Sequence, residues 1–465
     1  MSERWGEVVA ELRLDARHCR IHVEGWQSWT PTTCYRLGEE QWAPSRPETW
    51  TSCYGGSRPR PPKDSFQGDG LLIVDPGTGD DIVAVGALAA DREIPMIRCR
   101  RSGERGLLIS ADGPVSIIRI AAGLGLEAAK SAFAEAFAAA SGVERIRPAP
   151  TIWCSWYGYY RGVREADIDA NMEAIEDRRL PVEVIQLDDG YQREVGDWLI
   201  TSSRFKSLSG IVERIRSRGY RAGIWISPFV VGARSTIAAE HPDWLVRSES
   251  GAPVIAVQNW GQDAYPLDLT HAGAQEYLTS VFSRFAQLGI DFFKLDFLFA
   301  AALGGRRYDG SLTSSQAYRL GLAHIRSTIG TRAYALGCGA PLLPSVGMVD
   351  AMRVSADTGP RWSAFEGDMS QPSGESAELS VRGRAYQHGR YWVNDPDCLL
   401  LDPDVERPQR RVRMIREFGG LRGLSGRIAT LDDWAVKTAR HLLTTIPPPT
   451  PFSLTQPQRP DRAIP

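Results

Sequence analysis

The sequence lacks the features that mark membrane and secreted proteins. No stretch approaches the roughly 18 uninterrupted apolar residues of a membrane span. The chain opens Met-Ser-Glu-Arg-Trp-Gly-Glu, without an apolar secretory region. These absences predict a cytoplasmic protein with no membrane partner.

Clustered metal ligands and strong charge are also missing. The seven cysteines form no C-x-x-C pair, and the seven histidines form no H-x-H or H-E-x-x-H group. No G-x-G-x-x-G motif follows an expected strand, which disfavours a dinucleotide site. A net charge of -2 provides no field for nucleic acid. We therefore predict reduced thiols, no metal, no cofactor and no nucleic-acid partner.

What is present is the composition of a large globular chain. Its 465 residues are 43% hydrophobic and 24% charged, which favours two domains. Short β-rich runs between about residues 71 and 120 alternate with turn clusters and predict a sandwich-like amino-terminal domain over residues 1–125. A linking segment, 126–149, contains an alanine-rich helix at about 126–140 and ends at a proline-rich break.

After Pro150 the pattern changes to short apolar strands separated by longer helical segments. This alternation predicts a (β/α)8 barrel over residues 150–440, rather than an open doubly wound sheet. The remaining residues, 441–465, are proline-rich and are expected to be disordered. The eight expected strands are 152–156, 182–187, 222–226, 292–296, 333–337, 351–355, 391–394 and 426–430.

Polar residues gather where these strands end, and in a barrel that end builds the active site. Lys294 and Asp296 are two residues apart in an apolar run, so they should project from the same side of a strand. Buried charges are costly unless paired, and we interpret Asp296 as a catalytic nucleophile that Lys294 helps to keep ionised. The other candidates are Asp188, Asp189, Trp225, Cys338, Arg353 and Asp357.

An aspartate after a strand most often caps the next helix, and this is the competing interpretation for each acid taken singly. The Asp188-Asp189 pair and the cations Lys294 and Arg353 exceed what capping requires. A polyhydroxylated ring explains them together, because carboxylates and cations divide the sugar hydroxyls while Trp225 lies against the C–H face.

Glycoside cleavage needs two carboxyl groups, and Asp296 and Asp357 follow two different strands of the same barrel rim. A separation of about 5 to 5.5 Å would indicate retention of anomeric configuration, whereas roughly 6.5 to 9.5 Å would indicate inversion. If Asp357 is the general acid, its pKa should be raised so that it keeps its proton.

These motifs resemble the α-galactosidases of glycoside hydrolase family 36. The resemblance covers most of the chain and rests on six ordered motifs: Gly25-Trp-Gln-Ser-Trp29, Leu187-Asp-Asp-Gly190, Trp225, Lys294-Leu-Asp296, Gly337-Cys-Gly339 and Arg353-Val-Ser-Ala-Asp357-Thr-Gly-Pro-Arg-Trp362. Family members usually have a larger amino-terminal sandwich and a further β-domain after the barrel, so this chain departs from them at both ends.

The resemblance implies Asp296 as nucleophile and Asp357 as general acid and base. Asp188 and Asp189 would bind the galactose 4- and 6-hydroxyls, and Trp225 would line the sugar. Lys294 and Arg353 would contact ring hydroxyls or the catalytic carboxylates, and Cys338 would lie near the 2-hydroxyl, unless it is an inert core residue. Trp26, rather than Trp29, would reach over the barrel mouth. Asp395 and Asp397 are interpreted as loop and cap residues.

The expected activity is that of a retaining exo-α-galactosidase acting on small α-galactosides of the melibiose or raffinose type. A galactosyl-transferring, raffinose synthase-like enzyme and an α-N-acetylgalactosaminidase are the alternatives on the same scaffold. A non-catalytic galactoside-binding protein would have no reason to keep both Asp296 and Asp357. The sequence is compatible with either a monomer or a homo-oligomer.

Overall fold

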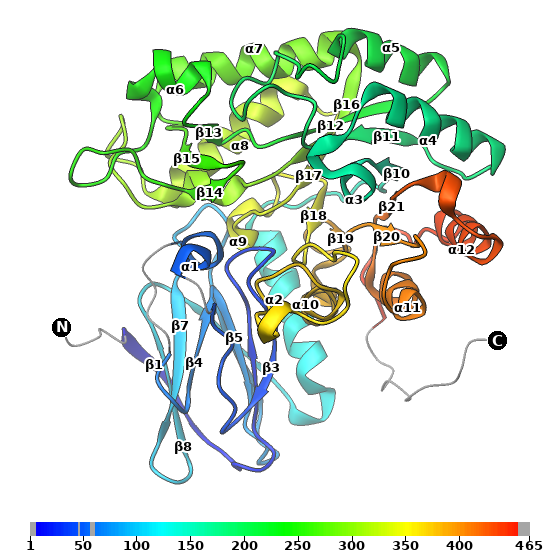
Figure 1. Cartoon of the computed structure of the whole chain (residues 1–465). Coiled ribbons are helices and arrows are strands. Elements are labelled where there is room, and N and C mark those ends of the chain that lie inside the picture. The colour runs from blue at the N-terminus through cyan, green and yellow to red at the C-terminus, as the bar shows by residue number, and fades with distance from the viewer. Residues whose placement is uncertain (1–5, 45–46, 56–60, 454–465) are drawn as a thin grey trace.

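The computed structural model describes residues 6–44, 47–55 and 61–453. Figure 1 shows two layers of β-strands from the amino-terminal part lying beside a larger body of mixed strands and helices. No helix among the described residues is long and apolar enough to cross a membrane. All seven cysteines are free thiols.

The amino-terminal part is a sandwich of two antiparallel sheets. One sheet has the order β1-β8-β7-β4 and the other the order β3-β2-β5-β6-β9. Apolar residues from both sheets, such as Ile21, Leu72 and Ile109, share one buried core. The strands are β1 Glu7–Arg13, β2 Arg20–Val23, β3 Thr33–Arg36, β4 Ser65–Asp69, β5 Leu71–Asp75, β6 Ile82–Gly86, β7 Met96–Ser102, β8 Gly106–Ala111 and β9 Ser116–Ile120.

Helix α2, Gly125–Ala140, connects the sandwich to the barrel, as the sequence predicted. It packs on β5, β6 and β9 through an apolar face that includes Phe133 and Phe137. A larger residue would not fit at Gly86 in β6, because the ring of Phe133 occupies the space that a Cβ would need. A short helix, α1 Pro47–Tyr54, lies at the barrel end of the sandwich (Figure 1).

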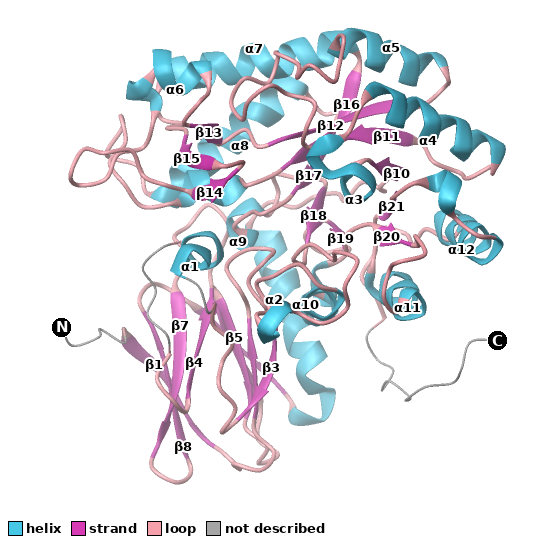
Figure 2. Cartoon of the chain, viewed as in Figure 1, coloured by secondary structure: helices cyan, strands magenta, loops and turns pink. Residues whose placement is uncertain are grey.

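The barrel is a parallel sheet of order β19-β18-β17-β16-β12-β11-β10-β21-β20, with helices outside it (Figure 2). The predicted (β/α)8 architecture and the preceding β-rich domain are confirmed. The strands are β10 Thr151–Cys154, β11 Val184–Leu187, β12 Arg221–Ile226, β16 Ile290–Leu295, β17 Tyr334–Gly337, β18 Ala351–Arg353, β19 Val393–Asp395, β20 Leu399–Leu400 and β21 Arg422–Ser425.

The barrel's seventh strand is interrupted. β19 pairs with β18, and β20 pairs with β21, while Asp395-Pro396-Asp397 lies at the break between them. Proline cannot donate a ladder hydrogen bond, so a strand that continued through Pro396 would lose pairing there. When β19 and β20 are counted as one interrupted strand, the nine strand segments form the eight strands of the closed barrel.

Most of the covering helices start at side-chain caps. Ser207, Thr313, Ser373 and Asp432 each accept a backbone N–H of the first turn. The main helices are α4 Glu165–Asp177, α5 Leu208–Ser217, α7 Ala272–Leu288, α8 Ser314–Ile329, α10 Gly374–Gly383, α11 Pro408–Phe418 and α12 Asp433–Thr444. Shorter helices are α3 Trp156–Tyr159, α6 Thr236–Glu240 and α9 Leu342–Ser345.

A three-stranded antiparallel excursion follows the third barrel strand. It contains β13 Val230–Gly232, β14 Val257–Asn259 and β15 Gln262–Pro266, in the order β13-β15-β14. The sequence analysis did not predict it. Its importance is that Trp260, in the turn between β14 and β15, reaches the site described below.

Two predictions about the end of the chain were wrong in position. The eighth strand is β21, whereas residues 428–430 form a 3-10 turn, because Leu424 and not Ile428 pairs with Trp153 of β10. Residues 441–453 were expected to be disordered. Instead α12 continues to Thr444, and the ring of Phe452 stacks on His388 at 4.0 Å between ring centroids. Residues 454–465 lie outside the described part.

We expect Gly383→Ala to destabilise the fold by about 1–3 kcal/mol, because its Cβ would overlap the carbonyl oxygen of Thr32 where the sandwich meets the barrel. Replacing glycine by alanine in a helix gains about 1 kcal/mol in helix propensity. This gain offsets part of the loss but does not remove the overlap with the backbone carbonyl. Chemical denaturation measures the difference. Gly310→Ala is the control, because a Cβ there would meet nothing within 4 Å. Equal stability of the two variants would contradict the close approach.

Candidate active site

Asp296 follows the fourth barrel strand, β16, and its carboxylate is held by two N–H donors. The indole Nε1 of Trp225 lies 2.9 Å from Oδ2, and the backbone N of Phe297 lies 2.7 Å from Oδ1. Its own backbone N–H is bonded to the carbonyl of Ile226 in β12, at 2.8 Å. Each oxygen of the Asp296 carboxyl therefore accepts one N–H hydrogen bond.

Asp357 lies in the loop after the sixth strand, β18, and is held by Arg353 of that strand. The guanidinium Nη1 is 3.1 Å from Oδ1 of Asp357. The same guanidinium contacts Asp395 through Nε at 3.1 Å and Asp397 through Nη2 at 2.7 Å. The Asp357 side chain is 23% exposed, whereas those of Asp395 and Asp397 are 3% and 1% exposed. Of the three acids, Asp357 is therefore the one that can meet a ligand.

The charges around Arg353 explain why Asp357 retains a proton. One buried cation faces three carboxylates, so one acid is left without full compensation. Burial and the negative charge of Asp397 raise the pKa of Asp357 to about 7, and the charge of Asp296 adds to the effect, against Arg353 and Lys294. Asp357 and Asp296 thus differ in environment, and Asp357 matches the raised pKa that the sequence analysis required of a general acid.

Lys294 does not pair with Asp296, contrary to the expectation drawn from their spacing. Its Nζ lies 2.9 Å from Oδ2 of Asp188, and both side chains are buried. Burial alone would lower the pKa of Lys294, but the neighbouring groups Asp188, Cys154 and Cys338 together, with Asp188 first among them, raise the pKa well above its ordinary value. β16 ends at Leu295, so Asp296 lies just beyond the strand, where the alternation of faces no longer applies.

Asp188 and Asp189, after the second strand, make different contacts. Besides Lys294, Asp188 accepts hydrogen bonds from Gln186 Nε2 at 2.7 Å and from the Cys154 thiol at 3.3 Å. Asp189 accepts from Gln192 Nε2 at 2.6 Å and from Trp260 Nε1 at 2.8 Å. Burial raises the pKa of Asp189, whereas the hydrogen bonds from Trp260 and Gln192 lower it in part.

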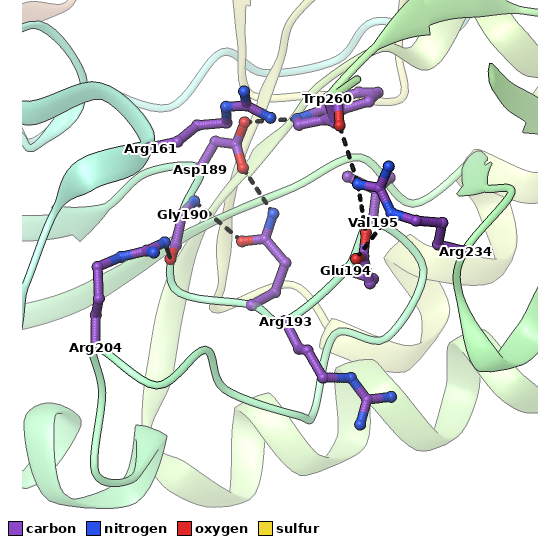
Figure 3. A pocket seen from close by; sticks show the side chains of 10 residues that line it. Arg161, Asp189, Gly190, Arg193, Glu194, Val195, Arg204, Arg234 and Trp260 are labelled. Atoms are coloured by element: carbon purple, nitrogen blue, oxygen red, sulfur yellow. Dashed lines mark hydrogen bonds and ion pairs between the residues drawn. The ribbon is translucent and has the colours of Figure 1, made fainter. Parts of the chain in front are cut away.

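A pocket of about 290 Å³ opens beside Asp189 (Figure 3). Figure 3 shows Trp260 on one side of Asp189 and Arg234 beside Glu194 further along the wall. Neither Asp296 nor Asp357 lines this pocket, so it lies beside the two candidate catalytic carboxyls and is connected to the cluster through Asp189. The complete lining is Arg161, Asp189, Gly190, Gln192, Arg193, Glu194, Val195, Arg204, Arg234 and Trp260.

Trp225 and Cys338 are more enclosed than expected. Trp225 is 2% exposed and packs edge-on against Trp198, so its clearest role is the hydrogen bond to Asp296 rather than a broad stacking surface. Cys338, after the fifth strand, is also buried, and burial together with the charge of Asp296 raises the pKa of its thiol well above the ordinary value. Its backbone N–H donates to the carbonyl of Leu295, which fixes it next to Asp296.

Trp26 extends from the amino-terminal part to the barrel. It lies edge-on to Phe299, three residues after Asp296, with ring centroids 6.4 Å apart. Its carbonyl accepts the backbone N–H of Leu342, in the loop after the fifth strand, at 2.9 Å. Trp26 is 9% exposed, whereas Trp29 is half-buried.

Four residues of this cluster were not predicted as site residues. Asp395 and Asp397, interpreted as loop and cap residues, accept N–H groups of their own turn and also hold Arg353. Tyr157 donates a hydrogen bond to Asp397, and Trp260 donates to Asp189. Two acids flanking a proline at a strand end were a usable signal for the first pair. Nothing local marked Trp260, which lies 71 residues from its partner.

No group of three or more His, Cys, Asp or Glu side chains in the described part of the chain could hold a metal ion. The acidic side chains nearest the site are occupied by arginine, lysine and N–H donors, as described above. The chemistry available here is that of two carboxyl groups in unlike surroundings.

Comparisons with known proteins place this chain beside carbohydrate-cleaving enzymes. Residues 135–336 match the Melibiase family model. Over 159 residues the chain is 26% identical to Alpha-galactosidase 1 of Pediococcus pentosaceus, a match covering 32% of this chain and 20% of that protein. It is also 26% identical over 147 residues to the mouse Myogenesis-regulating glycosidase, covering 31% of this chain and 20% of that protein. The matched segments thus span about a fifth of these curated relatives.

A solved structure extends the likeness along most of the chain. The α-galactosidase TtGalA from Thermus thermophilus, in complex with stachyose, aligns with a TM-score of 0.76 and 26% identity, covering 93% of this chain and 92% of that one. The resemblance to α-galactosidases noted from the sequence is confirmed.

We expect Asp397→Asn to lower the pKa of Asp357 below about 7, because it removes a negative charge that now opposes ionisation. Without the Asp397 carboxylate, the guanidinium of Arg353 also interacts more strongly with Asp357, which lowers the pKa of Asp357 further. Carbon-13 NMR of labelled aspartate carboxyls, titrated against pH, measures the change. Asp404→Asn, at an exposed position seven residues further along the chain, is the control. An unchanged or higher pKa in Asp397→Asn would contradict the charge balance described here.

Proposed function

Because the chain carries a Melibiase-family domain over residues 135–336, we propose that the protein is a retaining exo-α-galactosidase that hydrolyses terminal α-galactosyl residues from small galactosides. The observation that carries the proposal is the asymmetry of the two candidate carboxyls. Asp296 accepts hydrogen bonds from Trp225 and Phe297, whereas Asp357 keeps a proton to about pH 7. A nucleophile and a general acid need these opposite states.

In the first step, an oxygen of Asp296 attacks the anomeric carbon and the glycosidic bond breaks. Asp357 gives its proton to the departing oxygen, so the aglycone leaves as a neutral alcohol. A covalent galactosyl-enzyme intermediate remains on Asp296.

In the second step, Asp357, now ionised, takes a proton from water as that water attacks the same carbon. The bond to Asp296 breaks, galactose is released, and both carboxyls return to their starting states. Two inversions at one carbon give net retention.

The remaining site residues are proposed to bind and orient galactose. Asp188 and Asp189 would accept the 4- and 6-hydroxyls, with Lys294 contributing its ammonium group. Arg353 and Trp225 act chiefly through Asp357 and Asp296. Cys338 would lie near the 2-hydroxyl, and Trp26 would line the mouth from the amino-terminal side.

The preference for small galactosides is supported by the stachyose complex of TtGalA. Galactosyl transfer to a sugar acceptor and α-N-acetylgalactosaminidase activity use the same two carboxyls and remain the alternatives. Product analysis with and without sucrose separates the first, and matched nitrophenyl glycosides separate the second. A cytoplasmic location, a possible homo-oligomer, action without a cofactor and the domain limits 1–125, 126–149 and 150–440 belong to the same proposal.

We expect the two carboxyls to give opposite products with azide. Asp296→Ala should lose hydrolysis of nitrophenyl α-galactoside, while azide, entering the space of the missing carboxylate, should give β-galactosyl azide by one inversion. Asp357→Ala should retain the first step on this activated substrate, and azide should then give α-galactosyl azide by two inversions. Proton NMR of the anomeric signals identifies each product. Near-normal hydrolysis by Asp296→Ala, or the same anomer from both variants, would refute the assignment.

We expect kcat/KM for melibiose to fall as the pH rises through about 7. Asp357 must be protonated to start the reaction, and its proton is lost above its pKa of about 7. The measurement is a pH–rate profile from pH 4 to 9. In Asp397→Asn the falling limb should move to lower pH, in step with the pKa of Asp357. A wild-type profile that stays flat to pH 9 would contradict the role of Asp357 as the acid.

A further inference from the structure

Arg384, which follows helix α10, uses all five of its N–H donors in a fully buried position. Nε donates to Glu24 at 2.8 Å, and the two terminal nitrogens donate to the carbonyls of Gln27, Ser28, Thr30 and Val354 at 2.7 to 3.0 Å. Four of these partners lie in the amino-terminal loop, residues 24–32, which follows β2. The fifth, Val354, lies directly after β18, the strand that bears Arg353.

Glu24, the ionic partner of Arg384, is equally enclosed. Both side chains are 0% exposed. Its Oε1 also accepts from the hydroxyl of Thr32 at 2.7 Å, and its Oε2 accepts from Tyr386 at 2.6 Å and Gln387 at 3.2 Å. A buried ion pair offsets its desolvation only when such further hydrogen bonds are present, and here both partners have them.

A second contact joins the same loop to the same strand. The hydroxyl of Ser28 donates to the carbonyl of Arg353 at 2.6 Å. The carbonyls of two consecutive residues, Arg353 and Val354, are therefore both fixed from outside the barrel. The main chain of Arg384 is tied in turn to β19, because Asn394 Nδ2 donates to its carbonyl at 3.0 Å.

The side chain of Arg353 is the group that holds Asp357. We propose that the amino-terminal loop positions Asp357 for proton transfer by fixing the backbone that carries Arg353. It does so through the hydrogen bond of Ser28 and through the ion pair of Glu24 with Arg384. Ser28, Glu24 and Arg384 are positioning residues, since each acts through Arg353 and none is proposed to touch the substrate. This inference rests on the proposed function.

The location of the contacts favours positioning over simple attachment of the two parts. A buried ion pair adds little net stability compared with apolar residues of the same size, so joining the sandwich to the barrel does not require one. Directed hydrogen bonds instead fix a geometry, and displacement of a reacting group by about 1 Å can cost on the order of a hundredfold in rate. Here the directed bonds fall on the two residues from which the loop to Asp357 starts.

The experiment compares two galactosides that differ in their need for an acid. Melibiose releases a sugar hydroxyl, which requires protonation, whereas nitrophenyl α-galactoside releases a stable phenolate. For Ser28→Ala we expect kcat/KM for melibiose to fall roughly tenfold and kcat/KM for the nitrophenyl substrate to change less than about twofold, because kcat/KM reports the first step, in which only melibiose needs the acid. Ser65→Ala is the matched control, because it removes a buried serine hydroxyl bonded to the carbonyl of Pro62, within the sandwich alone. Both substrates should be unaffected by it.

A loss of equal size on both substrates, or no loss on melibiose, would overturn the proposal. Should Ser28→Ala fail to fold, Tyr386→Phe removes the hydrogen bond to Glu24 and a longer one from Gln387, and it should show the same selective loss on melibiose. Wild-type protein that hydrolyses neither galactoside would instead contradict the proposed function, and the positioning role would fall with it. The two failures are thus told apart by the wild-type control.

Discussion

The environment of Arg353 governs the chemistry proposed here. A guanidinium that is 3% exposed faces Asp357, Asp395 and Asp397. In a low-dielectric interior, one cation does not balance the charge of three ionised carboxylates. The consequence is a proton on the most accessible acid, Asp357. The pKa of Asp357 is therefore raised by burial and by the neighbouring charges of Asp397 and Asp296, against the opposing charge of Arg353.

The break in the seventh strand makes this arrangement possible. Pro396 ends β19, and Asp397 adopts a positive φ of 80°, an uncommon conformation for a residue other than glycine. The turn is held by hydrogen bonds from the Asp397 N–H to Asp395 and from the Cys398 N–H to Asp397. As a result both carboxylates face Arg353 from one short segment. The amino-terminal loop contacts the carbonyl of Arg353 at the end of β18, so the sandwich and the barrel meet just before the loop that carries Asp357.

Much of this fold was readable from the sequence, because apolar strands alternating with capped helices have few stable arrangements other than a barrel. The residues at strand ends were identified for the same reason. Partner choice was not readable: spacing placed Lys294 with Asp296, whereas it pairs with Asp188, 106 positions away. The eighth strand was misplaced because the sequence around Ile428 resembles a β-strand more than Arg422–Ser425 does. Only the pairing with β10 shows which segment forms the strand. Contacts between distant segments, such as Trp260 with Asp189, leave no local pattern.

The most direct test of this account is the titration of Asp357 in the wild-type protein. Carbon-13 NMR of aspartate-labelled enzyme should contain one carboxyl signal that is absent from Asp357→Asn and that titrates near pH 7. A signal that titrates near the ordinary aspartate value of about 4 would contradict the account, because Asp357 would then be ionised at neutral pH and unable to protonate a leaving group.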